Sequence, residues 1–85
     1  MNITKILTKS EAKWKLIRLS RIILEAEFPK KNKIFDVEFK GKIYKLKLNN
    51  SNQIMISQLF EKYKFKEGDT LKIKSVNKRF EFNLE

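Results

Sequence analysis

Apolar and polar residues alternate strictly along much of the chain after Pro29, and this alternation restricts the fold more than any other feature. The first run, FDVEF over residues 35–39, places three apolar residues on one side and two acidic residues on the other. A second run, YKLKL over residues 44–48, follows Lys40-Gly41, where glycine tolerates the positive φ of a tight turn. Alternation with a period of two is typical of a half-buried strand, so these residues predict a β-hairpin.

The rest of the chain predicts further short elements joined by turn residues. Ile54 and Ile56 indicate a short strand, and Ser57 is suited to cap a brief helix that runs to Tyr63. Residues 67–69, Glu-Gly-Asp, break the chain before two alternating strands around a turn at residues 76–78. Many short antiparallel strands with two small helices suggest a closed or nearly closed barrel, which also hides sheet edges. We therefore predict a mainly β (α+β) fold, a small antiparallel pseudobarrel of about six to seven strands, in one domain over residues 1–85.

The first third of the chain is compatible with two local structures. Apolar residues recur with helical spacing and fit one amphipathic helix over residues 10–27, capped by Ser10. Alternatively, a strand ends near Leu19, and Ser20 caps a shorter helix that Pro29 terminates. The helical periodicity favours the single helix slightly, whereas the strands that follow favour the broken arrangement.

Positive charge is in large excess. The chain carries 20 Lys and Arg against 10 Asp and Glu, a formal net charge of +10. Such an excess indicates a polyanionic partner, either nucleic acid or anionic lipid headgroups. The cations are interleaved with apolar residues instead of forming a tail, so we expect them on the surface of a folded domain.

The lack of cysteine and histidine excludes the commonest catalytic and metal-binding chemistry. Thiol and imidazole ligands are missing, and so are the usual nucleophile–base pairs. Asp36 and Glu38 share one face of a strand, but Lys33 and Lys40 flank them and favour ordinary surface charge. We therefore expect no enzymatic activity, no metal site and no cofactor. Apolar runs stay shorter than the ~18–20 residues that cross a bilayer, so no membrane partner and a cytoplasmic location, nucleoid-associated in a prokaryote, are expected.

Short motifs follow one another in an ordered series along the chain. They are Ile3, Lys5, Leu7-Thr8, Ser10-Glu11, Arg18-Leu19, Phe28-Pro29, Gly41-Lys42, Asn49-Asn50-Ser51 and Gly68-Asp69. In this order the chain resembles the B3-type DNA-binding pseudobarrel, known from plant transcription factors and from recognition domains of some bacterial restriction endonucleases. It departs from that family at Glu11, where Asp is usual, and at Ser20, where Pro is common. The usual Trp of the hairpin is replaced by Ile43 or Tyr44, and these departures favour a prokaryotic relative, such as the specificity domain of a restriction system.

The resemblance implies two arms that clasp the major groove, a first arm over residues 9–18 and a second arm over residues 49–53. The residue types support the same function, because Asn and Gln can make paired contacts to adenine and Arg or Lys suits guanine. The candidate DNA-binding residues are Lys9, Ser10, Lys13, Trp14, Lys15, Arg18, Arg21, Lys47, Asn49, Asn50, Ser51, Asn52 and Gln53. For the arms to enter one groove, we expect a helix from Ser20 to Phe28 and a first arm that is mostly non-helical.

Each part of this set also has a purely structural interpretation. The Asn-rich segment would then be a turn held by Asx hydrogen bonds, and the cations would be a solvated face. A lone Trp in so small a domain is more often a core residue than a contact, which applies to Trp14. Arg18 would pair with a carboxylate.

The expected function is double-stranded DNA binding that is sequence-specific through the major groove. The chain would be a recognition domain of a restriction system or a small transcription regulator, a monomer rather than a dimer, with any nuclease on another domain or chain. The alternatives are a swapped-hairpin dimeric transcription regulator and an OB-type protein that binds RNA or single strands. A basic amphipathic helix over residues 10–27 that binds proteins or membrane surfaces is a third alternative.

Overall fold

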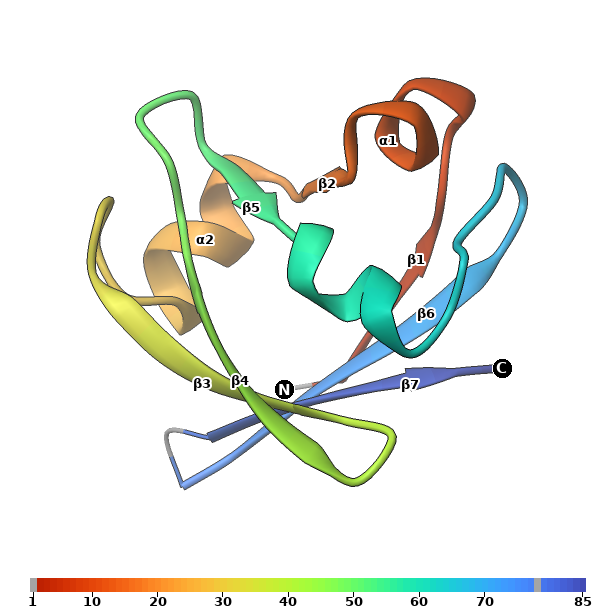
Figure 1. The fold of residues 1–85 in the computed structure, drawn as a ribbon. Coiled ribbons are helices and arrows are strands. Elements are labelled where there is room, and N and C mark those ends of the chain that lie inside the picture. Colours follow the sequence, from red (N-terminus) through yellow and green to blue (C-terminus); the bar gives the residue numbers. More distant parts are fainter. Residues whose placement is uncertain (1, 78) are drawn as a thin grey trace.

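A computed structural model describes residues 2–77 and 79–85, which form seven strands, two α-helices and one 3-10 helix (Figure 1). The strands are β1 (Asn2–Ile6), β2 (Leu16–Arg18), β3 (Ile34–Phe39), β4 (Lys42–Lys47), β5 (Gln53–Met55), β6 (Thr70–Val76) and β7 (Arg79–Leu84). The helices are α1 (Lys9–Trp14), α2 (Arg21–Glu27) and the 3-10 helix η1 (Ser57–Glu61). This arrangement confirms the predicted mainly β fold with two short helices. In the described ranges, none of the helices has the length and apolar character that a membrane span requires.

Two sheets surround the core. The larger has the strand order β1-β6-β7-β3-β4, and the smaller pairs β2 with β5. Neighbouring strands are antiparallel apart from β3 and β7, which run parallel with Val37 opposite Phe80. An isolated bridge between Leu48 and Ile54 links the chain after β4 to β5. The larger sheet keeps β1 and β4 as edges, so the pseudobarrel is open and the expected closure is incomplete.

The predicted alternation holds in the strands. Phe35, Val37 and Phe39 of β3 are buried while its acidic residues are half-buried on the other face, and β4 and β7 also alternate between buried and more exposed positions. α2 lies against one side of this core (Figure 1). The ring of Phe28, just after α2, stacks on Phe80 with centroids 4.5 Å apart and meets Phe35 edge-on at 5.6 Å. This aromatic cluster fixes α2 to the sheet.

The helix predicted to begin at Ser20 is confirmed. The Ser20 hydroxyl accepts a hydrogen bond from the Ile23 N–H at 3.3 Å, and α2 ends before Phe28-Pro29. A left-handed residue, Lys15 with φ of 58°, separates α1 from the next strand. The N-terminal third is therefore broken into α1, β2 and α2, and the single helix over residues 10–27 is excluded.

The prediction that the first arm is mostly non-helical is wrong, because α1 occupies six of its ten residues. The helix starts from Thr8 rather than from Ser10. The Thr8 hydroxyl accepts a hydrogen bond from the Glu11 N–H at 3.2 Å, and the Glu11 carboxylate accepts one from the Thr8 N–H at 2.9 Å. This reciprocal capping box makes a six-residue helix stable enough to form.

The second half of the chain contains a short helix and a turn for which the sequence makes definite predictions. The helix after β5 is a 3-10 helix that ends before Tyr63, and Ser57 is its first residue instead of its cap. Ile56 precedes it, and no side chain of the described residues caps it. The turn predicted at residues 76–78 includes residue 78, which lies outside the described residues, while Asn77 has a φ of 50°.

Tyr44 is a core residue whose hydroxyl finds no hydrogen-bond partner among the described residues. An unsatisfied buried hydroxyl costs about 1–3 kcal/mol. We therefore expect Tyr44→Phe to leave the free energy of unfolding unchanged or to raise it by about 1 kcal/mol, as measured by urea denaturation. The control is Tyr63→Phe at a half-buried position, which should have no effect. A loss of more than about 1 kcal/mol in Tyr44→Phe would show that the hydroxyl is hydrogen-bonded in solution.

Candidate nucleic-acid interface

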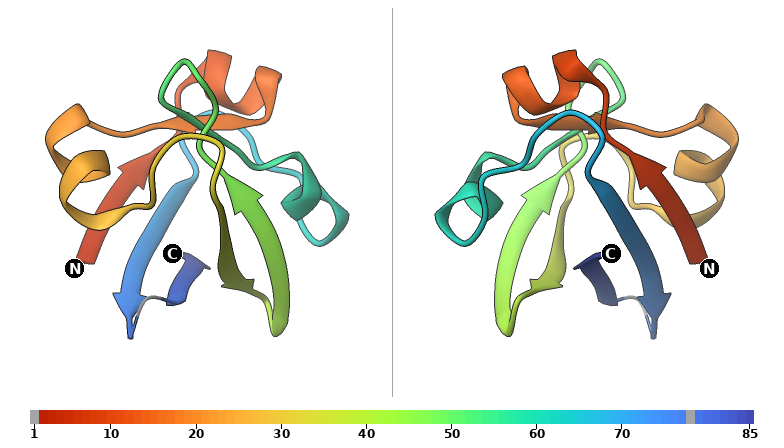
Figure 2. Two further views of the ribbon diagram at one scale, coloured as in Figure 1. Left: turned by 90° about the vertical axis from the view of Figure 1, so that its left-hand side faces the viewer. Right: turned by 90° about the vertical axis from the view of Figure 1, so that its right-hand side faces the viewer.

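The two arms meet in the small sheet. β2 ends the first arm and β5 begins at the last residue of the second, and they pair with Ile17 opposite Ile54 and Arg18 opposite Gln53. Ile17 and Ile54 are fully buried and anchor the pair to the core. Directly opposed residues of an antiparallel pair project to the same face, so Arg18 and Gln53 lie side by side. α1 and the loop between β4 and β5 lie at the same end of the molecule in both views of Figure 2.

A buried carboxylate fixes the first arm in place. Glu11 is only 1% exposed, and its Oε2 accepts the backbone N–H of Arg18 at 2.7 Å and lies 2.9 Å from the Lys5 ammonium of β1. Burial would raise the pKa of Glu11, but Lys5 and the N–H groups of Thr8 and Arg18 outweigh burial and lower that pKa. The charged carboxylate therefore ties β1, the start of α1 and β2 together.

Apart from the buried Glu11, the polar and aromatic side chains of the first arm are exposed. This holds for Lys9, Ser10, Lys13, Trp14, Lys15 and Arg18. The expectation that Trp14 is a core residue is wrong, since it is 61% exposed. The Arg18 guanidinium donates to the Ser10 hydroxyl at 3.2 Å and not to a carboxylate. The contact of Arg18 with a carboxylate is made by its backbone N–H, which donates to Glu11. The ammonium groups of Lys13 and Lys15 each lie 5.2 Å from an aromatic ring, of Trp14 and Phe60 respectively.

Asn49 shapes the second arm from within. Its Oδ1 accepts the N–H groups of Ser51 at 2.9 Å and Gln53 at 3.0 Å. Its Nδ2 donates to Gln53 Oε1 at 3.1 Å, and Asn52 adopts a left-handed φ of 59°. The structural interpretation of the Asn-rich segment as an Asx-stabilised turn therefore holds for Asn49.

The tip of the second arm is exposed and braced from a neighbouring loop. Asn50 and Ser51 are exposed, and Asn50 Oδ1 accepts a hydrogen bond from Asn32 Nδ2 at 2.8 Å. Asn32 has a φ of 65°, and its N–H donates to the Leu48 carbonyl at 2.7 Å. Asn32 was not among the candidates, because no local pattern connects a residue before β3 to a loop after β4.

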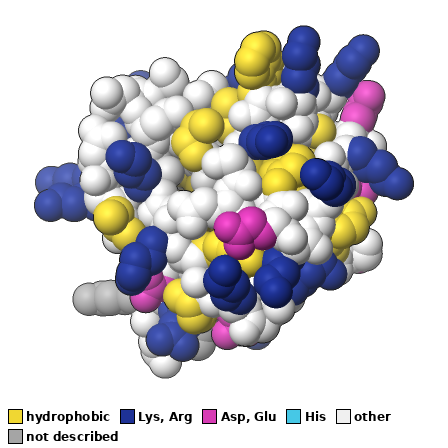
Figure 3. All heavy atoms as spheres, in the orientation of Figure 1, with side chains coloured by type: hydrophobic (Ala, Val, Ile, Leu, Met, Phe, Trp, Pro, Cys, Tyr) yellow, Lys and Arg dark blue, Asp and Glu magenta, His cyan; other side chains and the backbone are white. Residues whose placement is uncertain are grey.

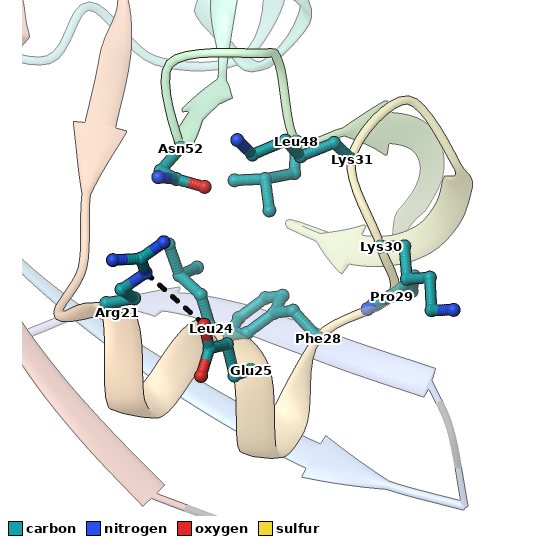
Figure 4. Close-up of a pocket in the computed structure, with 9 residues that line it drawn as sticks. All are labelled: Arg21, Leu24, Glu25, Phe28, Pro29, Lys30, Lys31, Leu48 and Asn52. Atoms are coloured by element: carbon teal, nitrogen blue, oxygen red, sulfur yellow. Dashed lines mark ion pairs between the residues drawn. The ribbon is translucent and has the colours of Figure 1, made fainter.

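Arg21 and Lys47 lie outside the two arms. Lys47 is exposed on the outer face of β4, just before the second arm. Arg21 is on α2, where its Nε lies 3.3 Å from Glu25 Oε1. It lines a cleft of about 450 Å³ between α2 and the second arm, across from Asn52 (Figure 4). Lys30 and Lys31 also line this cleft, although no local sequence pattern groups them with the second arm.

The fold and this end of the molecule define a small basic pseudobarrel with two adjoining arms. No protein-family model matches the chain, and no curated protein matches it in sequence. Its fold is similar to that of the N-terminal domain of Helicobacter pylori LlaJI.R1, with a TM-score of 0.80 and 13% identity over 99% of this chain and 86% of that one. It is also similar to the hypothetical Arabidopsis thaliana protein At1g16640.1, with a TM-score of 0.71 and 10% identity over 100% of this chain and 89% of that one. At these identities the comparisons establish a shared fold.

Proposed function

We propose that the protein binds double-stranded DNA through the major groove with its two arms together. One observation carries the proposal: the β2–β5 pair places the exposed cations of the first arm beside the amide side chains of the second. Cations hold phosphate, amides read base edges, and a major groove ~12 Å wide admits a helix such as α1. The B3-type resemblance supports this assignment. The two structures of similar fold come from a bacterium and a plant, the groups over which that resemblance extends.

The proposal gives the interface residues different roles. Arg18 and Gln53 are neighbours on one face, where Arg18 suits a guanine. Gln53 Nε2 suits the N7 acceptor of an adjacent adenine, because Gln53 Oε1 already accepts from Asn49. Asn50 and Ser51 at the loop tip suit further base contacts, whereas Asn49 is occupied in shaping the loop. Phosphate contacts are assigned to Lys9, Lys13, Lys15, Arg21 and Lys47.

We extend the proposal to sequence-specific recognition, by a recognition domain of a restriction system or by a small transcription regulator. Any nuclease would then belong to another domain or chain. We propose a monomer, because both neighbours of β6 in the sheet, β1 and β7, belong to the same chain. In a swapped dimer, a strand of the partner would take one of these two places. The proposed location is cytoplasmic, where chromosomal DNA of a prokaryote is found.

The structure offers less support to the alternatives. An OB-type protein stacks bases on exposed aromatic residues of a sheet, but the aromatic residues of β3 and β7 are buried in the core. A membrane-surface helix needs a long amphipathic segment, whereas residues 10–27 are divided among α1, β2 and α2.

The salt dependence of binding tests the proposal. If five or six of the assigned cations contact phosphate, log K should fall against log salt with a slope of roughly −5, as measured by fluorescence anisotropy with a labelled duplex. Duplex should be bound more tightly than a single strand of equal length. A control variant, Lys72→Ala on the outer face of β6, should leave both affinity and slope unchanged. A slope shallower than about −2, or a preference for the single strand, would refute the assignment.

Selection from random duplexes tests the narrower proposal of sequence specificity. The protein should enrich a defined site over successive rounds. If the pool stays random while the salt slope is steep, the protein binds DNA without sequence specificity and the narrower proposal is wrong.

A further inference from the structure

Trp14 is a large aromatic residue that the fold leaves in water. It is the last residue of α1, it is 61% exposed, and it is the one Trp of the chain. The other large exposed hydrophobic residues are aliphatic and lie on several different elements: Ile6, Ile22, Ile34 and Ile43. Scattered aliphatic residues of this kind are normal on protein surfaces. An exposed indole at the end of a fixed helix is, in contrast, a candidate contact for a binding partner.

The charges around Trp14 indicate the kind of partner. Lys9, Lys13 and Lys15 are exposed on and beside α1, and Lys13 Nζ lies 5.2 Å from the Trp14 ring. Glu11 is the single acidic residue of the first arm, and it is buried against Lys5. Hydrophobic and cationic side chains stand together over this part of the molecule in Figure 3. A polyanion that also offers flat apolar rings, which is a nucleic acid, complements both features.

The backbone holds this residue in a defined position. Lys15 turns left-handed directly after Trp14 and leads into β2, and the Glu11 carboxylate binds the backbone on both sides of α1, at Thr8 and Arg18. Trp14 therefore sits on a short, fixed helix that leads, through Lys15, into β2, the strand that carries Arg18 opposite Gln53. Little backbone freedom is lost when such a residue binds, which favours stacking over loose contact.

We propose that Trp14 is a wedge that stacks on a nucleobase at a partly opened step of the bound duplex. This inference rests on the proposed duplex binding. The lysines around α1 hold the phosphates, and the indole enters, from the major groove that the two arms occupy, a base step that partly opens. Pyrimidine–purine steps open most easily, so selected sites should contain TA or CA/TG at a fixed distance from the bases read by Arg18 and Gln53.

Intrinsic fluorescence reports on Trp14 directly, because the chain has no other Trp. The probe is the duplex recovered most often from the random selection, titrated into the wild-type protein. Stacking should quench the indole strongly and protect it from acrylamide in the complex. Binding with unchanged fluorescence and unchanged acrylamide access would overturn the inference. Quenching that grows with protein concentration before DNA is added would also overturn it, since it would show self-association.

Substitutions separate stacking from general apolar contact. Trp14→Ala should weaken binding to the selected duplex by roughly 5- to 150-fold, the effect of losing one base–aromatic stack. Trp14→Leu should lose nearly as much, because it keeps apolar volume without a π face, whereas Trp14→Phe should retain most of the affinity. The control is Ile43→Ala on the outer face of β4, which should bind like the wild type. Equal affinity of the Leu variant and the wild type would overturn the stacking assignment.

A duplex with an abasic position at the pyrimidine–purine step provides the decisive comparison. The missing base leaves room for the indole, so the wild type should bind this duplex more tightly than the intact one, and Trp14→Ala should not. Failure of the two proposals is distinguishable. If duplex binding itself is absent, the proposed function fails. If all variants bind intact and abasic duplexes equally with a steep salt slope, only the wedge fails.

Discussion

Replacing Glu11 with Gln is expected to lower the free energy of unfolding by roughly 3–5 kcal/mol. The carboxylate is 1% exposed and binds three donors: the Thr8 N–H, the Arg18 N–H and the Lys5 ammonium. The amide of Gln cannot serve all three, and the Lys5 side chain, 20% exposed, loses its counter-charge. Urea denaturation at neutral pH measures the loss.

The control for this substitution is Glu25→Gln, the same chemical change at an exposed ion pair. Glu25 pairs with Arg21 one helical turn away, and the two side chains are 71% and 80% exposed. Such pairs contribute little, so no measurable change in stability is expected. Equal effects of the two substitutions would contradict the role assigned to Glu11.

The pH dependence of the Glu11→Gln effect has a definite sign. The pKa of Glu11 is lowered in the folded protein, so the unfolded chain takes up the proton first as the pH falls. The stabilisation is complete above the ordinary pKa of 4.5 and is lost as the pH falls through the lower folded-state pKa. The stability difference between wild type and variant should therefore be constant from neutral pH down to about 4.5 and shrink below it.

Asn50→Ala is expected to cost ~1–3 kcal/mol of binding free energy on the selected duplex and little on random DNA. Asn50 is exposed at the tip of the second arm, where it can reach a base edge. Lys13→Ala should instead weaken binding to all sequences alike and reduce the salt slope by about one. Anisotropy titrations of both variants on both duplexes, over a series of salt concentrations, measure the two effects.

Asn32→Ala is the matched control for the loop tip. It removes the hydrogen bond to Asn50 Oδ1 but leaves Asn50 itself in place. Its effect on the selected duplex should be smaller than that of Asn50→Ala. If Asn50→Ala and Lys13→Ala weaken all duplexes equally, the second arm is only a turn and its base-reading role is wrong.

Local patterns were sufficient to predict much of the fold. The alternation in residues 35–39 and 44–48 and the cap at Ser20 all depend on neighbouring residues, and each is present in the structure. α1 was missed although its signal is local: Thr8 and Glu11 have the spacing of a capping box, but Ser10 was read as the cap. The parallel pairing of β3 with β7 was not foreseen, because it joins residues more than 40 positions apart and leaves no local pattern.

In the candidate site, too, local sequence patterns predicted some features, while contacts between distant residues were not predicted. Residue types and spacing brought the two arms to attention, and the β2–β5 pair places them together. They could not show that Asn49 spends both its amide atoms on the loop, that Asn32 braces Asn50, or that Trp14 lies in solvent. The contacts of Asn49 are local, and the sequence left the Asx turn and base reading as alternatives, whereas the positions of Asn32 and Trp14 depend on tertiary packing.

The strand order has a consequence for how the protein folds during its synthesis. The last strand, β7, is the middle strand of the larger sheet, and β1 pairs with β6, so that Asn2 lies opposite Lys74. At a translation rate of roughly 5–20 residues per second, about 4–14 s pass between the synthesis of β1 and that of β6. The β3–β4 hairpin and the β1–β6 pair stay separate until β7 leaves the ribosome and joins them. We therefore expect the domain to fold only after β7 has left the ribosome, and a ribosome stalled before residue 79 to hold a chain that proteases cleave readily.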